Sequence, residues 1–269
     1  MLFPIFMIKV YRWNYLMKKQ NINYSFKDSF LMYGTGMYIG IITPGRLGEL
    51  SKIAFLKKNN SLGKSTVSVV VDRLTDLIFL LFFGYFGFFL FFSLFKNLIL
   101  ILTLILVFSL ILLITFLKTN IIKFLLKKML NLIIPAKYQK SWKINFQDFV
   151  NELKIYKLKN YLFIFLITAF SWFIYYFQTY LLAKSIGINN LSFLFISIAV
   201  TIAGLVTLLP ISILGIGTRD VTLIGLFNAF SINQETTVSF SFLILLIGIL
   251  TGLACSICWL IKPIQFSKD

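Results

Sequence analysis

Histidine is absent from this chain of 269 residues, and other reactive side chains are scarce, with two cysteines and nine Asp and Glu. The lack of histidine removes the most common proton shuttle and metal ligand of proteins. Cys255 and Cys258 form a CxxC pair inside an apolar run, with no histidine and no second pair to complete a zinc site. We therefore expect no metal and no cofactor, and we interpret both cysteines as packing residues.

Charged residues of both signs are few, at 13% of the chain against 59% hydrophobic residues. Soluble domains contain about 25% charged and about 45–50% apolar residues. These values predict an all-α integral membrane protein, a multi-pass helical bundle in the cell membrane, built as one domain over residues 1–269. Residues 1–19 form a short apolar run, expected as an interfacial helix or as part of a tilted one. Longer runs reach the ~20 residues that span a bilayer, and they cover residues 66–93, 98–117, 161–183 and 238–261.

The net charge of +17 marks the loops and does not indicate nucleic-acid binding. Lys and Arg concentrate between the apolar runs, as in cytoplasmic loops, where they also attract anionic phospholipid. Residues 9–27 hold five, 50–65 hold four and 118–159 hold ten, whereas 184–190 hold one and 231–236 none. We expect no nucleic-acid partner, and we expect 118–159 to be a cytoplasmic amphipathic connection, with helices lying on the membrane interface.

The same charge distribution predicts two re-entrant hairpins. Both flanks of residues 29–49 are basic, so this segment enters from the cytoplasm and returns, turning near residues 43–45. Both flanks of residues 191–230 are nearly free of positive charge and lie outside, with a break between Pro210 and Gly217. Hairpins that enter from opposite faces, each followed by a full span, form the inverted repeat of many transporters, whose sites lie near the midplane.

Three polar stretches interrupt the apolar runs and hold four of the nine acidic residues. An ionisable group at membrane depth costs about 2.5–3.5 kcal/mol on insertion scales, so each needs a partner or a function. We therefore predict a polar site inside the membrane. The stretches are TPGRLGE at 43–49, DRLTD at 72–76 and GIGTRD at 215–220.

The first and third stretches predict helix N-termini that bind an anion. Thr43 and Thr218 are the expected caps, and Pro44 is favoured at a first helical position. Gly45 and Gly48 allow close approach of another backbone or of a headgroup. Free N–H groups and the positive end of the helix dipole then attract a phosphate.

An arginine lies beside each predicted helix start. Arg46 and Arg219 are the expected ligands of a lipid phosphate, provided that the two termini meet at depth. The structural alternative pairs Arg46 with Glu49, and Arg219 with Asp220 or another acid. The two interpretations are compatible, and the sequence leaves both open.

The middle stretch places two carboxylates on one helix face, because Asp72 and Asp76 are four residues apart. A functional interpretation makes them headgroup contacts or proton-coupling acids. A structural interpretation pairs them with Arg46 or Arg73, locking the first hairpin to the span. We favour the structural role for Asp72 and the functional role for Asp76.

These motifs resemble the lysylphosphatidylglycerol synthase transmembrane family, also called the flippase-like domain, which includes the membrane half of MprF-type proteins. The resemblance covers nearly the whole chain, and Arg12-Trp13 resembles a pair that precedes the first motif. Asp72 and Asp220 stand where the family usually has Glu, and the chain looks short at its N-terminus. The motifs are PGRLGELSK at 44–52, VVDRLTDL at 70–77, and Pro210 followed by LGIGTRD at 214–220.

The resemblance implies a flippase that moves a phosphate-bearing lipid between leaflets, such as an aminoacylated phospholipid or a lipid-linked sugar. The family's aminoacyl transferase activity belongs to a separate soluble domain that nothing in this chain matches. We therefore expect this chain to have no enzymatic activity. Two alternatives stay open: a non-catalytic membrane partner of a separate lipid-modifying or glycosyl transferase, and an intramembrane lipid enzyme. Membrane lipids are the expected partners, and a homo-oligomer is left open.

Overall fold

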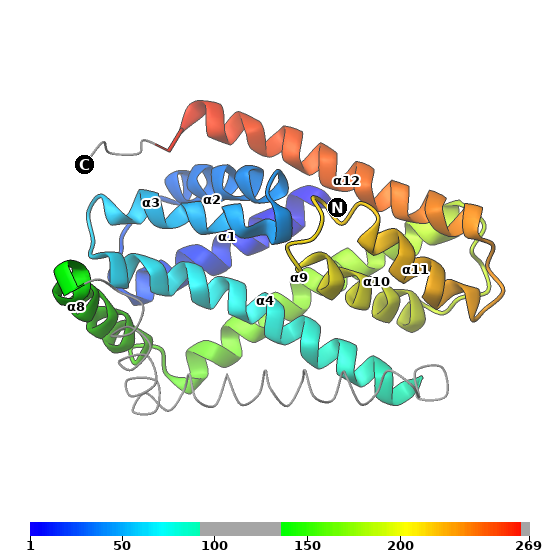
Figure 1. The fold of residues 1–269 in the computed structure, drawn as a ribbon, viewed down its shortest axis with the longest axis horizontal. Coiled ribbons are helices and arrows are strands. Elements are labelled where there is room, and N and C mark those ends of the chain that lie inside the picture. Colours follow the sequence, from blue (N-terminus) through cyan, green and yellow to red (C-terminus); the bar gives the residue numbers. More distant parts are fainter. Residues whose placement is uncertain (92–135, 265–269) are drawn as a thin grey trace.

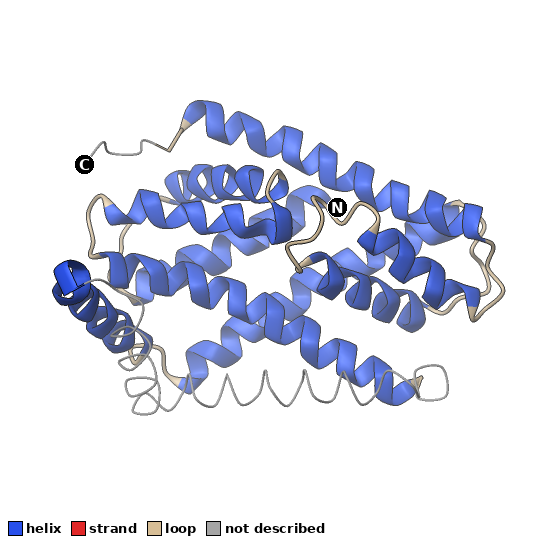
Figure 2. Cartoon of the chain, viewed as in Figure 1, coloured by secondary structure: helices blue, strands red, loops and turns tan. Residues whose placement is uncertain are grey.

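The computed structural model describes residues 1–91 and 136–264, and every regular element in these two ranges is a helix (Figures 1 and 2). The all-helical prediction is therefore confirmed for this part of the chain. The apolar run 98–117 lies outside it, as does the first half of the predicted connection. The helices are α1 (Leu2–Lys19), α2 (Phe26–Ile41), the 3₁₀-helix η1 (Pro44–Ser51), α3 (Lys52–Lys57), α4 (Leu62–Leu90), α8 (Ala136–Leu153), α9 (Leu158–Ser185), α10 (Phe193–Thr207), α11 (Thr218–Asn228) and α12 (Gln234–Ile261).

Side-chain caps fix the starts of four helices. The hydroxyl of Ser25 accepts from the backbone N–H of Asp28 at 3.0 Å, at the start of α2. Each such cap satisfies one of the N–H groups that a helix start leaves without a partner. The capping residues are Ser25 for α2, Ser61 for α4, Ser192 for α10 and Asn233 for α12.

Two helices are long and apolar enough to cross a membrane, judged by length and composition over the described residues. They are α9 and α12, with 28 residues each. Helix α4 is as long, with 29 residues, but it carries Asp72, Arg73 and Asp76. At 1.5 Å per residue, helices of this length extend roughly 40 Å.

The chain folds as two similar halves, α1–α4 and α9–α12. In each half one helix precedes a helical hairpin, and a long helix follows it. The hairpins are α2 with η1 and α3, and α10 with α11; they extend from opposite ends of the bundle and their tips meet near its middle (Figure 1). The halves also exchange contacts, because α12 packs on α2 and α4 packs on α10, while α1 packs against α9.

Separate apolar clusters stabilise each half. Phe195, Phe227 and Phe240 are buried where α10, α11 and α12 meet. Trp13 and Tyr33 are buried in the first half, together with residues of α3 and α4. The inner face of the second half of α1 is therefore covered by protein.

Helix α8 confirms that the second part of the predicted connection is helical, and part of its apolar face packs on the bundle. Its place on a membrane interface stays a prediction. Val150 and Leu153 are buried, and Leu153 packs in a cluster with residues of α1, α4 and α9. The loop residue Tyr156 is buried beside it and donates to the Leu16 carbonyl at 3.0 Å. Burial raises the pKa of the Tyr156 hydroxyl. The apolar side of the amphipathic pattern is thus explained in part by packing of α8 against other helices of the bundle.

A charged cavity between two hairpin tips

The tips of the two hairpins are in close contact at Gly45. A methyl group placed on Gly45 would lie 2.8 Å from the carbonyl oxygen of Leu208 and 3.3 Å from Cα of Pro210. Gly45 and Arg46 both have positive φ, at 59° and 56°. Glycine at Gly45 thus allows both the left-handed backbone and the close approach of the second tip.

The second tip has a similar backbone. Leu214 and Gly215 are consecutive residues with φ of 55° and 76°. Each tip therefore contains glycine and one larger residue at positive φ, and the left-handed region costs a larger residue about 1–2 kcal/mol. We interpret both tips as strained turns held by their surroundings.

A cavity of about 400 Å³ lies between the tips and the long helices. Its wall is mostly apolar, with residues from both hairpins and from α1, α4, α9 and α12. Arg46 and Arg219 both line it, so the structure brings together the two arginines that the sequence selected. The charged lining residues are Lys9, Arg46, Arg73, Asp76 and Arg219.

Arg12 is the centre of the charged network beside this cavity. Its guanidinium is fully buried and uses all five N–H donors. Nε donates to Asp72 Oδ1 at 2.9 Å, and Nη1 and Nη2 donate to Asp76 at 2.9 and 3.0 Å. The remaining donors bond the Thr168 hydroxyl at 2.7 Å and the Asp72 carbonyl at 3.1 Å. One side chain thus joins α1, α4 and α9.

Lys52 carries the network into the first hairpin. Its buried ammonium is 3.1 Å from Asp72 Oδ2 and 4.0 Å from Glu49 Oε2. It also lies over the Tyr33 ring, 4.1 Å from the centroid, which adds a cation–π contact. Glu49 in turn pairs with Arg73 of α4. These contacts hold η1 and α3 against α4.

Asp76 is the point where the network reaches the cavity. Lys9 Nζ lies 3.3 Å from its Oδ2, and the indole N–H of Trp172 donates to its Oδ1 at 3.1 Å. Asp72 lies deeper, does not line the cavity and is bound by Arg12 and Lys52. The geometry agrees with a structural role for Asp72, whereas a direct role for Asp76 stays a prediction.

Arg219 holds the second tip through mostly neutral partners. Its Nε donates to the Ser241 hydroxyl at 2.7 Å and its Nη1 to the Leu214 carbonyl at 3.2 Å. Asp220 lies 3.8 Å from Nη2 and accepts from the Gly217 N–H at 2.8 Å and from Ser241. The expected Arg219–Asp220 pair is therefore present at long range, and Asp220 mainly caps α11.

The expected partners of Asp72 and Asp76 were wrong. Both carboxylates bind Arg12, and neither binds Arg46 or Arg73. Arg73 is one position from Asp72, and adjacent residues of a helix point about 100° apart. It therefore reaches Glu49 and leaves the face that Asp72 and Asp76 share. The predicted Arg46–Glu49 clasp is also wrong: over residues 1–91 and 136–264, Arg46 makes no ion pair.

The predicted caps need correction as well. Gly217 precedes α11 as its N-cap, and the Thr218 hydroxyl bonds Ser212 at 2.7 Å instead. Thr43 precedes a 3₁₀-helix with left-handed residues, where its hydroxyl accepts from the Gly48 N–H at 2.8 Å. Gly48 lies against the Ile39 backbone. Thr43 and Gly48 therefore shape the first tip, because the left-handed turn delays the regular helix until α3.

The charge pattern missed Lys9, Arg12 and Lys52 as site residues, because it counted all three among the basic connections. Arg12 and Lys52 nevertheless stand in the stretches that carry the family resemblance. All three lie in α1 and α3, where Arg12 and Lys52 are buried. A signal was present in α1: Lys9 and Arg12 are three residues apart and so share a helix face. When these three residues are left out of the count, the connections on both sides of the first hairpin still contain lysines, so the topology argument is unchanged.

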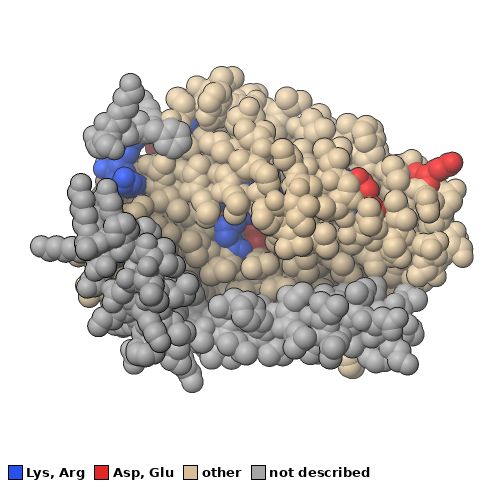
Figure 3. Space-filling model, in the orientation of Figure 1, with Lys and Arg blue, Asp and Glu red and all other residues tan. Residues whose placement is uncertain are grey.

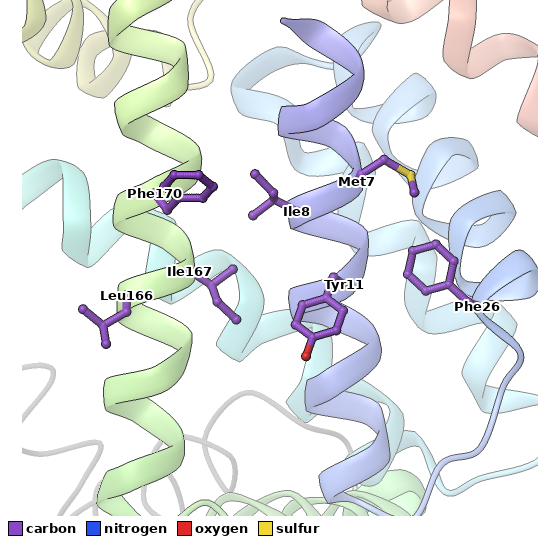
Figure 4. Close-up of a pocket in the computed structure, with 7 residues that line it drawn as sticks. All are labelled: Met7, Ile8, Tyr11, Phe26, Leu166, Ile167 and Phe170. Atoms are coloured by element: carbon purple, nitrogen blue, oxygen red, sulfur yellow. The ribbon is translucent and has the colours of Figure 1, made fainter.

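An open apolar groove lies on the outer side of α1 and α9. It measures about 540 Å³ and contains no charged side chain in its lining. Figure 4 shows Ile8 of α1, and Ile167 and Phe170 of α9, directed into the space between these helices. We therefore expect a polar or charged ligand to bind in the charged cavity and not in this groove.

The chain is similar to a known family of membrane proteins. Residues 1–255 match the model of a family described as "Lysylphosphatidylglycerol synthase TM region". A UPF0104 membrane protein of Pyrococcus horikoshii is 38% identical over 72 residues, which cover 25% of this chain and 22% of that protein. The match thus spans about a fifth of the relative's length. No solved structure is significantly similar to this chain.

Proposed function

Because this chain belongs to the lysylphosphatidylglycerol synthase transmembrane-region family, we propose that it is a membrane transporter that moves a phosphate-bearing lipid between leaflets. The observation that carries the proposal is the cavity lined by Arg46 of one hairpin tip and Arg219 of the other. Arginine matches phosphate geometry through paired N–H donors. We propose no chemical step, since the carboxylates of the site are bound by cations and by N–H and O–H donors of the protein.

We also propose that both hairpins are re-entrant. They extend from opposite ends of the bundle and each packs on a long helix of the other half (Figure 1). Two hairpins that enter from opposite ends are typical of an inverted repeat. Irregular backbone at membrane depth occurs only where it is buried in protein or lines a cavity. The left-handed turns at both tips line the cavity. On this proposal the cavity lies near the midplane of a multi-pass protein.

The surface charge supports one orientation. In Figure 3, lysine and arginine side chains show at the end that holds the α3–α4 loop and near the middle of the face, whereas only acidic side chains show at the opposite end. Basic loops stay in the cytoplasm. The end with the α3–α4 loop is therefore assigned to the cytoplasm, and the α9–α10 and α11–α12 loops to the outside.

Cysteine labelling tests this topology in a background in which Cys255 and Cys258 are replaced. Lys19→Cys and Asn59→Cys are expected to react with a membrane-impermeant maleimide only from the cytoplasmic side. Asn190→Cys and Gln234→Cys are expected to react only from outside, and all four positions are exposed. If Lys19→Cys and Asn59→Cys label from opposite sides, the first hairpin is a single crossing and the re-entrant proposal is wrong.

The cations of the site divide into fixed and available groups. Arg12 and Lys52 are buried and bound to carboxylates, so their role is to hold α1, α3 and α4 together. Arg46 has no ion pair among the described residues, and Arg219 hydrogen-bonds mostly neutral oxygens. A headgroup can therefore bind Arg46 and Arg219 without breaking the network, while the tips move relative to each other.

Lipid translocation in liposomes tests the transport role. Arg46→Gln and Arg219→Gln are each expected to slow the movement of a phosphate-bearing, headgroup-labelled lipid at least about tenfold, since charge-assisted hydrogen bonds contribute about 1.5–3 kcal/mol. Loss of label on adding an impermeant quencher measures the rate. Lys57→Gln is the matched control, because it removes an exposed charge outside the cavity. Folded arginine variants that transport at the rate of the unsubstituted protein would refute the assignment.

A further inference from the structure

We propose that the cavity selects a lipid headgroup that carries two negative charges, as in a terminal phosphate monoester or a diphosphate. The inference rests on the proposed function, because it names the substrate class of the same site. A site of this kind would prefer a doubly charged headgroup to a singly charged phosphodiester, and to a headgroup to which a cationic amino acid has been added.

The charges around the cavity do not balance. The network and the two tips together contain four carboxylates, which are Glu49, Asp72, Asp76 and Asp220. They contain six cations, which are Lys9, Arg12, Arg46, Lys52, Arg73 and Arg219. Two positive charges are therefore in excess. Arg219 is buried, and a buried charge without a close partner is unfavourable unless a ligand supplies the opposite charge. Arg46 is exposed where it lines the cavity, so it is free to bind such a ligand.

The excess lies on the hairpin tips. Arg12 and Lys52 are fully buried and have charged partners at 2.8 to 3.1 Å. Arg46 has no charged partner among the described residues, and Arg219 has Asp220 only at 3.8 Å. One available guanidinium therefore comes from each hairpin. Two such groups around one cavity suit a dianion, whose oxygens can accept from both.

The carboxylates of the site are already paired with donors of the protein. Glu49 is held by Arg73, and Asp72 by Arg12 and Lys52. The four oxygens of Asp76 and Asp220 are likewise occupied by donors of the protein. These donors are Lys9, Arg12 and Trp172 for Asp76, and Gly217 and Ser241 for Asp220. A cationic headgroup would add to the positive excess, and every carboxylate of the site already has a donor from the protein.

Competitive binding to the purified full chain in neutral detergent tests this inference without any translocation step. The probes are short-chain phosphatidic acid, phosphatidylglycerol and lysylphosphatidylglycerol, with glycerol 3-phosphate as the lipid-free phosphate monoester. We expect phosphatidic acid to bind at least about tenfold more tightly than phosphatidylglycerol, a difference of about 1.4 kcal/mol. Lysylphosphatidylglycerol is expected to bind most weakly of the lipids, and glycerol 3-phosphate more weakly than phosphatidic acid.

Arg46→Gln removes one of the two excess charges and is expected to abolish the preference for phosphatidic acid, while Lys57→Gln keeps it. Equal binding of phosphatidic acid and phosphatidylglycerol, or tighter binding of lysylphosphatidylglycerol, overturns the inference but leaves transport intact. Equal competition by glycerol 3-phosphate overturns the lipid assignment. Selective binding without translocation in liposomes supports the inference and refutes the transport proposal instead.

Discussion

Replacing Arg12 with glutamine is expected to lower the free energy of unfolding by about 3–5 kcal/mol, because it removes one partner from a buried ion-pair network. Asp72 would keep Lys52, and Asp76 would keep Lys9 and Trp172, but both would lose their strongest donors. Glutamine supplies two N–H donors where arginine supplies five. We expect a large fall in the thermal unfolding temperature, measured on detergent-purified protein.

Arg46→Gln is the matched control, because it makes the same exchange at an arginine without a carboxylate partner among the described residues. It is expected to change the free energy of unfolding by less than about 1 kcal/mol, as for other exposed charges. The two variants thus separate the arginine that holds the fold from the arginine that is available to a ligand. Comparable unfolding temperatures for Arg12→Gln and Arg46→Gln would contradict the structural role given to Arg12.

Gly45→Ala is expected to lower the free energy of unfolding by about 1–3 kcal/mol, since a residue with a side chain is forced into the left-handed region. The added methyl group would also meet the backbone of Leu208 and Pro210, which cannot swing aside as a side chain can. We therefore expect the two tips to separate. Thermal unfolding and liposome translocation should both report the change, with slower lipid movement.

Gly225→Ala provides the comparison for this substitution. Gly225 lies within α11, where an added methyl group meets no atom within 4 Å. Alanine is favoured over glycine inside a helix by up to about 1 kcal/mol, so this variant is expected to be as stable as the parent or more so. A Gly45→Ala protein with unchanged stability and transport would show that the tips need no close contact.

The hairpins could be predicted from the sequence because lysines are distributed unevenly between the loops. That asymmetry, with the breaks at residues 43–45 and at Pro210, located helix pairs that the structure has as α2 with η1 and as α10 with α11. Their insertion into a membrane from opposite faces stays a prediction. The two arginines were found for a similar reason, since each follows a glycine-containing break in an apolar run.

The pairing of charges could not be predicted in the same way. Arg12 meets Asp72 and Asp76 across 60 and 64 residues of chain, and no local pattern encodes such a contact. Lys52 follows a polar stretch and resembles a loop lysine, although η1 and α3 bury it over Tyr33. The left-handed turn at Arg46 could not be predicted either, because Thr43 and Pro44 are typical of an ordinary helix start.

The hydrogen bond from Arg12 to Thr168 has a consequence for biosynthesis. These residues are 156 positions apart, so the ribosome has completed α1–α4 long before α9 emerges. The earliest helix therefore receives its last donor–acceptor partner from one of the later ones. We expect helices α1–α4 to reach their final arrangement only after α9 has been synthesised.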